Sequence, residues 1–478
     1  MGLFNSIRLG SSAAGDYEIE RSLRFNRSDD PQLQRTASST SNTFTFSTWL
    51  KRASLSTYQY FFSVGGQGLL FSNDDGIRVN SDGGANTSTA KFRDLSAWYH
   101  VVLSMSSGSA TVYVNNVAYL SSVSGFSLST STNYLKVGWL AGDAGEFNFD
   151  GYLAETQLID GTALTPSSFA ETDAVTGEYK PKRYGGGYGT SGFLLNYSDN
   201  SGTTATTLGK DTSGNGNNFT PNNFGTGDAV KDSPTNNFAI LNALDWKYDK
   251  PTFSEANLKW TTNTTSGSNT VYSSFNLPNT GKWYLEVAAE NINTGSYGYA
   301  QPLSMLSDTG NSRYLWWVYG QAQAQVNTDS GVVNVGTVSN GDIFQFAFDS
   351  DSGKIWFGKN NTWFLSGDPA NGTAMSTPAT NTGSNPRFYI DGRTGTATNR
   401  LIANFGQDSS FANSKTAQGN TDGNGQGDFY YAPPTGFKAL CSANLPDPSI
   451  KLPDKHFDTL LYTGTDTSAN RTISGLEF

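Results

Sequence analysis

The residues of this sequence that could do acid, base or nucleophilic chemistry are few and scattered. The 478 residues include two histidines, His100 and His456, and a single cysteine, Cys441. Because the histidines lie far apart, no local pattern supports a nucleophile paired with a histidine base. His100 lies in an alternating apolar stretch, and we expect it to be packed and hydrogen-bonded. The single cysteine excludes an intrachain disulfide.

Glu146, Asp150 and Glu155 are the nearest group of carboxylates that could form a glycosidase pair. A retaining glycosidase needs an acid and a nucleophile about 5 Å apart. Glu146 and Asp150 share a face of a regular strand, but Glu155 does not. We therefore expect a solvated edge or turn and predict no catalytic residue, with hydrolysis as the alternative.

Two pairs of neighbouring aspartates, Asp29 with Asp30 and Asp74 with Asp75, could bind calcium. Calcium prefers carboxylate and carbonyl oxygens, but aspartate pairs are also common in turns. Residues 211–222 match only the first half of a calcium loop, because the twelfth position is an asparagine. Turn formation is therefore the expected role of these residues, and calcium is the one cofactor that they could bind.

Tyr314, Trp316, Trp317 and Tyr319 form a dense aromatic run. An exposed ring can cover the apolar face of a sugar while neighbouring polar groups bind the hydroxyls. Trp317 and Tyr319 share a face of a regular strand. We predict glycan binding at these four residues, with core packing as the alternative for at least half of them.

The elements that position these residues are predicted to be strands. The chain contains 30 Phe, 23 Tyr and 10 Trp, and no long window has an apolar period of 3.6 residues. Residues 341–364 show a strand with one strongly apolar face, a turn, a second strand, an Asn-Asn turn and a third strand. Residues 98–120 repeat this plan. The fold class is therefore all-β.

Charge and hydropathy disfavour nucleic acid and membrane as partners. With 31 basic and 41 acidic side chains the net charge is −10, which disfavours binding to DNA or RNA. No apolar run approaches the ~20 residues of a membrane span, and the N-terminus lacks a conventional secretory signal. We predict no nucleic-acid partner and no membrane insertion.

Three sequence segments resemble those of a known family. They are Trp98-Tyr99-His100-Val101-Val102, Thr111-Val112-Tyr113-Val114-Asn115 and Phe149-Asp150-Gly151-Tyr152-Leu153-Ala154-Glu155. Residues 21–172 resemble the laminin G-like branch of the concanavalin A-like lectin and glucanase superfamily. The resemblance implies an antiparallel sandwich of jelly-roll type, lectin-like surfaces and, in many members, one calcium ion.

A second resemblance lies further along the chain. Gly281-Lys282-Trp283-Tyr284-Leu285-Glu286-Val287, together with the first two strands of residues 341–364, resembles the SPRY family. It covers residues 253–440 and implies a second antiparallel sandwich, built for binding and without catalytic residues.

Residues 173–252 connect the two predicted sandwiches. Leu208-Gly209-Lys210-Asp211-Thr212-Ser213-Gly214-Asn215-Gly216-Asn217, followed by Asp232-Ser233-Pro234-Thr235-Asn236, resembles a connector of structural proteins of tailed bacteriophages. We expect this irregular connector to wrap the domains. Residues 1–20 are predicted to form an N-terminal arm and residues 441–478 a C-terminal tail.

The chain as a whole resembles a fibre or virion structural protein of a tailed bacteriophage. We predict a non-enzymatic tail-fibre or spike-like component, made in the host cytoplasm and located in the virion. The resemblance implies other virion proteins as partners, host surface glycan as a ligand, and a homotrimer. A capsid decoration, fibre-base or adaptor protein is one alternative, and a polysaccharide depolymerase is the other.

Overall fold

The computed structural model describes residues 17–36, 41–128, 134–140, 147–262, 268–292, 298–306, 313–318, 323–328, 331–373, 386–394, 398–446, 452 and 456. Within these ranges the chain forms 32 strands and five short 3-10 helices, without an α-helix. The all-β prediction is confirmed. No helix in the described ranges is long and apolar enough to cross a membrane.

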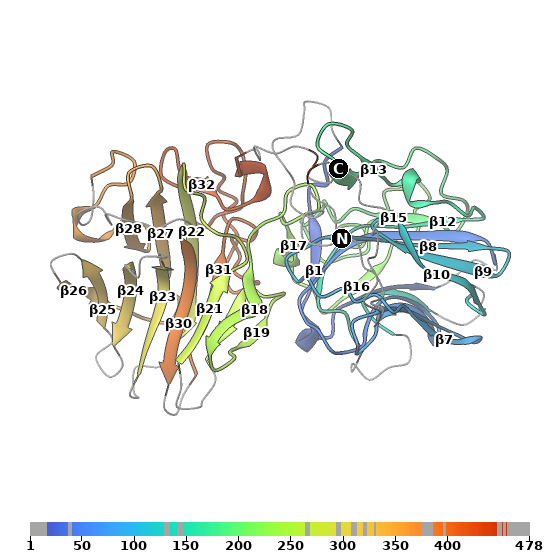
Figure 1. Cartoon of the computed structure of the whole chain (residues 1–478), viewed down its shortest axis with the longest axis horizontal. Coiled ribbons are helices and arrows are strands. Elements are labelled where there is room, and N and C mark those ends of the chain that lie inside the picture. The colour runs from blue at the N-terminus through green and yellow to red at the C-terminus, as the bar shows by residue number, and fades with distance from the viewer. Residues whose placement is uncertain are drawn as a thin grey trace, which may run out of the picture.

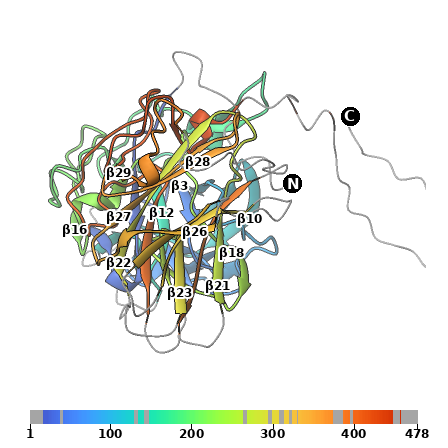
Figure 2. The ribbon, with the colours of Figure 1, turned by 90° about the vertical axis from the view of Figure 1, so that its left-hand side faces the viewer.

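Two β-sandwiches lie side by side (Figure 1), and the second lies in front of the first in the turned view of Figure 2. The strands of the first sandwich form sheets A and B. In spatial order, sheet A consists of β10 (Val117–Ser124), β9 (Ser109–Val114), β8 (Tyr99–Ser106), β3 (Phe44–Arg52), β12 (Gly151–Asp160), β1 (Ser22–Phe25) and β17 (Ala229–Val230), with β15 (Phe193–Leu195) also paired to β12. Sheet B consists of β16 (Thr220–Asn222), β2 (Gln32–Thr36), β11 (Tyr134–Val137), β4 (Gln59–Val64), β5 (Gln67–Phe71), β6 (Ile77–Ser81) and β7 (Gly84–Thr87).

The second sandwich is built from sheets C and D. Sheet C consists of β18 (Leu241–Tyr248), β21 (Ser268–Ser273), β30 (Arg387–Thr394), β23 (Gly298–Leu306), β24 (Arg313–Val318), β25 (Gln323–Thr328) and β26 (Gly331–Thr337). Sheet D consists of β19 (Thr252–Ser254), β20 (Lys259–Thr261), β31 (Arg400–Asn404), β22 (Lys282–Asn291), β27 (Ile343–Asp349), β28 (Lys354–Lys359) and β29 (Thr362–Trp363), with β32 (Lys438–Ala439) parallel to β22.

The remaining elements are short. A ribbon of β13 (Ala170–Thr172) and β14 (Tyr179–Pro181) stands apart from the four sheets. The 3-10 helices are η1 (Arg27–Asp29), η2 (Pro166–Ser168), η3 (Thr226–Asp228), η4 (Phe364–Ser366) and η5 (Ser442–Asn444).

Aromatic side chains fill the core of each sandwich. In the first, Phe46 of sheet A stacks on Phe62 of sheet B with ring centroids 4.0 Å apart. In the second, Phe346 of sheet D meets Phe388 of sheet C edge-on at 6.0 Å. Paired rings bury a large apolar area and add directional contacts, so each sandwich has a core of its own.

The two predicted meanders have equivalent backbone geometry. At the second turn of the first meander, the amide of Asn115 donates to the His100 carbonyl at 2.9 Å, and the Asn115 side chain accepts from the His100 amide at 2.8 Å. Asn360 makes the same two bonds with Ile343 in the second meander, at 2.8 and 2.9 Å. The residues of both Asn-Asn turns have positive φ, as two-residue hairpin turns require.

The strongly apolar face predicted for the strand at residues 343–349 is confirmed, and the residues of β27 on the opposite face are buried as well. Phe344, Phe346 and Phe348 face the core between sheets C and D. Ile343 faces outward, where residues such as Phe411 cover sheet D. The second layer comes from loops late in the chain, which local periodicity does not reveal.

The segment predicted to be the connector is built into both sandwiches. β15, β16 and β17 extend sheets A and B, and Leu208 and Phe219 lie in the first core. β18, also within residues 173–252, is already the edge strand of sheet C. The segment therefore packs on the first sandwich before it enters the second.

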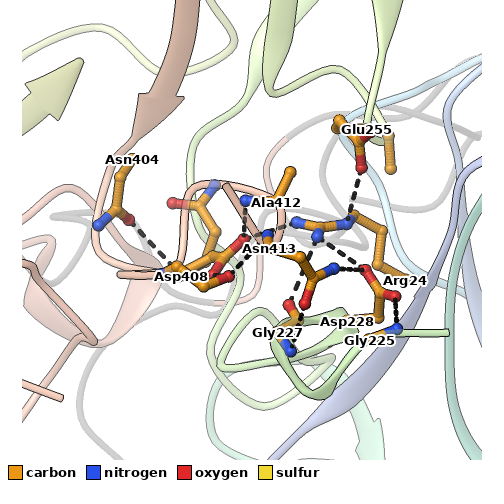
Figure 3. A network of polar contacts seen from close by, with 12 residues as sticks. Arg24, Gly225, Gly227, Asp228, Glu255, Asn404, Asp408, Ala412 and Asn413 are labelled. Carbon is orange, nitrogen blue, oxygen red and sulfur yellow. Dashed lines mark hydrogen bonds and ion pairs between the residues drawn. The ribbon is translucent and has the colours of Figure 1, made fainter. Parts of the chain in front are cut away.

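Buried ion pairs join the two sandwiches, and Figure 3 shows those of Arg24. The guanidinium of Arg24 on β1 lies 2.8 Å from Asp228, 2.7 Å from Asp408 and 3.5 Å from Glu255. Lys51 on β3 pairs with Asp232 and donates to the Asn237 side chain at 2.9 Å. Buried cations of this kind must be paired to remain in the interior.

Candidate functional site

Sheets A and B of the first sandwich differ in what covers their outer faces. On sheet A, Trp49 and Tyr152 pack against Ile19 and Val230, while Ile159 packs against residues such as Phe169. The outer face of sheet B has no comparable apolar cluster among the described residues, and several of its side chains are half-exposed. We call this outer face of sheet B, with the segments at residues 58, 139 and 147, the open face.

Tyr58, Tyr60 and Phe147 form an aromatic cluster on the open face. The Phe147 ring meets Tyr58 edge-on at 5.7 Å and is tilted over Tyr60 at 6.3 Å. The amide of Tyr60 donates to the carbonyl of Phe147 at 2.8 Å, which fixes the two segments together. Tyr58 and Phe147 are half-buried, so they present ring surface of the kind that packs against a pyranose.

The Tyr60 ring forms the floor of this cluster because it lies across Gly68 on the neighbouring strand. A Cβ atom at position 68 would lie 2.5 Å from Cδ1 of Tyr60. Tyr60 is opposite Leu70 in the pairing of β4 with β5, where a register shift occurs. A glycine at position 68 is therefore required for the ring to lie close to the sheet.

Two cations lie over aromatic rings on the same face. Nζ of Lys136 is 5.6 Å from the centroid of the Trp139 ring, and Cζ of Arg78 is 5.4 Å from that of Tyr58. The hydroxyl of Ser63 donates to the carbonyl of Trp139 at 2.7 Å and holds that ring in place. Burial lowers the pKa of Lys136. The face thus offers apolar rings and hydrogen-bond donors together.

The predicted aromatic run lies on the second sandwich, far from this cluster in the fold. Tyr314, Trp316 and Trp317 belong to β24, an inner strand of sheet C, where Trp317 is paired with Ala300 and Trp316 with Gln325. Tyr319 lies outside the described residues. Glycan binding at these four residues stays a prediction.

The predicted calcium ligands lie in two turns of the first sandwich. Asp75 is paired with Arg52 at 3.1 Å and with Arg93 at 3.0 Å, and Asp74 is paired with Lys91. Carboxylates neutralised in this way are poor calcium ligands.

Asp29 and Asp30 fit calcium better. Asp29 accepts from the Asn26 amide, and Asp30 accepts from the Asn148 amide, both at 2.8 Å. Oδ1 of Asn148 is buried without a hydrogen-bond partner, so one further oxygen is available beside Asp30. No cluster of three or more acidic, histidine or cysteine ligands occurs within the described ranges. Calcium at this turn stays a prediction.

The loop at residues 211–222 forms a hydrogen-bonded turn. The carboxylate of Asp211 accepts from the amides of Ser213 and Asn217 at 2.8 Å and from that of Leu194 at 2.9 Å. The bond to the amide two residues further on defines an Asx turn. The loop thus forms the Asx turn that was the alternative to calcium binding at residues 211–222.

The carboxylates considered for hydrolysis have separate surroundings. Asp150 precedes β12 and interacts with Ser54 and Arg27, and burial raises its pKa. Glu155 lies at a register shift of β12 with φ of 47°, and its pKa is raised to about 7, mainly by burial. Glu146 lies outside the described residues. Asp150 and Glu155 therefore lie in separate environments with different neighbours.

His100 is fully buried on the covered face of sheet A. Its ring lies 4.7 Å from the Trp49 ring, Nε2 is 2.9 Å from the Ser47 hydroxyl, and Nδ1 is 2.8 Å from the Tyr179 hydroxyl. Burial lowers its pKa to about 3. His100 is therefore a neutral, packed side chain.

The residues of the open face were not singled out from the sequence. Alternation at residues 77–80 and 134–137 could have marked Arg78 and Lys136 as outward-facing, since Ile77, Val79 and Leu135 face the core. The aromatic cluster could not be found in this way, because Phe147 joins Tyr58 and Tyr60 only through the fold.

A sandwich with one covered sheet and one open sheet that carries rings and donors has the architecture of a lectin-like binding domain. Residues 26–169 match the family model of the concanavalin A-like lectin/glucanases superfamily. Over these residues the first sandwich resembles the concanavalin A-like lectin domains of that superfamily. No curated protein is significantly similar in sequence to the chain.

Three solved structures that match part of the chain are a Bacteroides protein, a pentraxin and a SPRY domain. A Bacteroides ovatus protein provisionally assigned to carbohydrate binding is 18% identical, with a TM-score of 0.32, and the match covers 43% of this chain and 59% of that one. The pentraxin of Limulus polyphemus is 16% identical over 33% of this chain and 76% of its own, with a TM-score of 0.24. The SPRY domain of human HERC1 is 12% identical over 30% and 87%, with a TM-score of 0.22.

Proposed function

We propose that this protein is a non-enzymatic, glycan-binding component of a tailed-bacteriophage virion, of tail-fibre or spike-like type. The aromatic cluster on the open face of the lectin domain is the observation that carries the glycan-binding part. Tyr58 and Phe147 are half-buried rings beside a sheet face whose outer strands are partly exposed, whereas the central Tyr60, Ser63 and Leu70 are buried. Rings supply contact area, and neighbouring donors supply orientation.

The virion setting is supported by the resemblance of residues 208–217 and 232–236 to a phage connector. Asp232 of this connector pairs with the buried Lys51, so the resembling segment helps to hold the two sandwiches together. We propose that the N-terminal arm attaches the protein to other virion proteins. Single glycan sites are weak, and repetition in a homotrimer would supply avidity.

Glycan-array binding by the intact oligomer tests the proposed function. Tyr58→Ala and Phe147→Ala are expected to lower the array signal at least tenfold without changing the oligomer. Tyr248→Ala is the matched control, because Tyr248 is 62% exposed on the second sandwich. Absence of binding to any host polysaccharide, or loss of binding only in the control, contradicts the proposal.

The joint between the sandwiches favours one second candidate, a capsid decoration, fibre-base or adaptor protein that binds only virion proteins. Arg24 is 1% exposed and interacts with carboxylates from both sandwiches, which suits a rigid spacer. Locating the chain in a cryo-EM map of the particle separates the two. A distal tip supports glycan binding, and a buried collar or capsid position supports the adaptor.

A depolymerase is the less favoured alternative, because Asp150 and Glu155 have separate partners. We propose that host polysaccharide incubated with the protein releases no reducing ends. Release that is abolished by Asp150→Asn would establish hydrolysis instead.

A further inference from the structure

The outward positions of sheet B have an unusual charge composition. In the described strands these positions contain two cations and no carboxylate, although acidic side chains outnumber basic ones, 41 to 31, in the whole chain. The outward residues are Gln32, Gln34, Thr36, Tyr60, Ser63, Gly68, Leu70, Arg78, Asn80, Ala85, Thr87, Tyr134, Lys136, Thr220 and Asn222.

Neither cation of the open face is neutralised by a carboxylate in the described part of the chain. Arg24, Lys51 and Arg52 of the same sandwich all have aspartate partners. Lys136 and Arg78 instead contact the rings of Trp139 and Tyr58. Nε of Arg78 is buried and has no hydrogen-bond partner.

The spacing of the two cations suits an extended ligand. Lys136 is on β11 and Arg78 is on β6, with β4 and β5 between them. Three strand spacings of ~4.8 Å place the two strands about 14 Å apart. Tyr60 and Ser63 of β4 lie between them on the outward side, buried and hydrogen-bonded to the segments at Phe147 and Trp139, over which a ligand would pass. A chain that crosses the strands could meet both cations while it passes the aromatic cluster.

The net charge of −10 does not oppose such a ligand strongly. At physiological ionic strength the Debye length is ~8 Å, so exposed charges elsewhere on the molecule are largely screened. One carboxylate bound to this region is that of Asp30, which accepts from Asn148, the residue bridged to Tyr60. Among the described outward residues of sheet B, the charged side chains are all positive.

We propose that the open face selects an acidic polysaccharide, whose anionic groups on separate sugar units contact Lys136 and Arg78 while a sugar ring packs on the cluster of Tyr58 and Phe147. This inference names the ligand class of the proposed glycan-binding function and rests on that function. Lys136 acts as a point charge, and the planar guanidinium of Arg78 can bind a carboxylate or sulfate through two donors.

The test is binding of the intact protein to hyaluronate oligosaccharides, to a sulfated oligosaccharide and to neutral dextran oligosaccharides of similar length, measured by calorimetry. At least one acidic series is expected to bind at least tenfold more tightly than dextran. Lys136→Gln and Arg78→Gln are each expected to weaken that acidic series about tenfold, since a hydrogen bond to a charged group contributes ~1.5–3 kcal/mol and 1.4 kcal/mol is a factor of ten. Dextran binding should change little.

Lys91→Gln is the matched control. Lys91 is an exposed lysine of the same sandwich, but it is already paired with Asp74, so its loss should not change acidic-glycan affinity. Raising the salt concentration should weaken wild-type binding more than binding by the Lys136→Gln, Arg78→Gln double variant.

The outcomes separate this inference from the function on which it rests. Equal affinity for acidic and neutral series, unchanged in both variants, overturns the acidic ligand and leaves glycan binding standing. If Lys91→Gln weakens binding to the acidic series as much as the two variants do, the acidic ligand is also overturned, because the effect of charge is then not specific to the open face. Failure of every glycan to bind overturns the proposed function itself.

Discussion

Nη1 of Arg24 lies 2.7 Å from Oδ2 of Asp408, although the two residues are 384 positions apart in the chain. Arg24 is on β1 of the first sandwich, and Asp408 follows β31 of the second. The Asp408 carboxylate also accepts from the amides of Ser410 and Ala412, at 2.9 and 2.8 Å, so its own loop holds it in position beside the arginine. This pair ties the two sandwiches together at a buried point (Figure 3).

Replacing Arg24 by methionine should destabilise the whole chain strongly. The variant keeps most of the apolar volume but leaves the carboxylates of Asp228 and Asp408 buried without a cation. Breaking one partner of a buried ion pair costs ~3–5 kcal/mol, and this loss should appear in the free energy of unfolding by denaturant. Lys231→Met is the control, because its partner Glu20 is 60% exposed and such pairs contribute at most ~1 kcal/mol. Equal losses in the two variants would contradict a buried joint.

Replacing Gly68 by alanine should reduce glycan binding by moving the Tyr60 ring. The new Cβ would lie 2.5 Å from that ring, and overpacking costs ~1–3 kcal/mol. Gly66, in the same hairpin, has no atom within 4 Å of an added Cβ, so Gly66→Ala is the matched control. Glycan affinity and thermal unfolding should change in the first variant only. Unchanged affinity in Gly68→Ala would show that the ring is not part of the site.

Glu155 should make the protein less stable as the pH rises from about 4.5 to about 7. Burial is the main reason that its pKa is raised from 4.5 to about 7 in the folded chain. The folded state therefore binds more protons than the unfolded state in this window, and stability falls with rising pH. A shift of this size corresponds to up to ~3 kcal/mol. Unfolding free energies at pH 4.5 and 8 should differ less in Glu155→Gln than in the wild type, and an identical difference would refute the assignment.

The second residue of an Asn-Asn turn should tolerate glycine and reject valine. Asn361 has φ of 64°, and its amide donates to the Gln345 side chain at 2.7 Å, a bond that any residue except proline keeps. Left-handed backbone costs ~1–2 kcal/mol for a residue with a Cβ and more when the side chain is β-branched. Asn361→Val should lower the free energy of unfolding by about 2 kcal/mol, while Asn361→Gly should change it little. A tolerated valine would show that the turn is not held at positive φ.

Local sequence predicted the strands and turns well where neighbouring residues pair with each other. The strand at residues 354–359 coincides with β28, and both Asn-Asn turns lie where the pattern placed them. Such hairpins depend on alternation and on residues that accept positive φ, and both are properties of a few adjacent positions. The face of His100 was also predictable, because Val101 and Leu103 take the core positions on either side of Val102.

The sites were less predictable than the fold. Asp74 and Asp75 resemble calcium ligands in sequence, but the fold brings Arg52, Lys91 and Arg93 to them. The second buried face of β27 depends on Phe411, which is distant in the chain. Pairing across such distances is decided by sheet order and by loops that return from late in the sequence, and neither leaves a local signal.

The sequence by itself determined that this is an all-β chain with two meanders, because period-2 alternation, turn residues and aromatic content act locally, and the likeness of the first domain to lectins rested on a family resemblance. Only the tertiary structure decided which sheet of that domain stays open, that Phe147 joins Tyr58 and Tyr60 there, and that Lys136 and Arg78 flank them. These residues come from separate strands of sheet B and the segments beside them, and only the spatial order of the strands places their side chains on one surface.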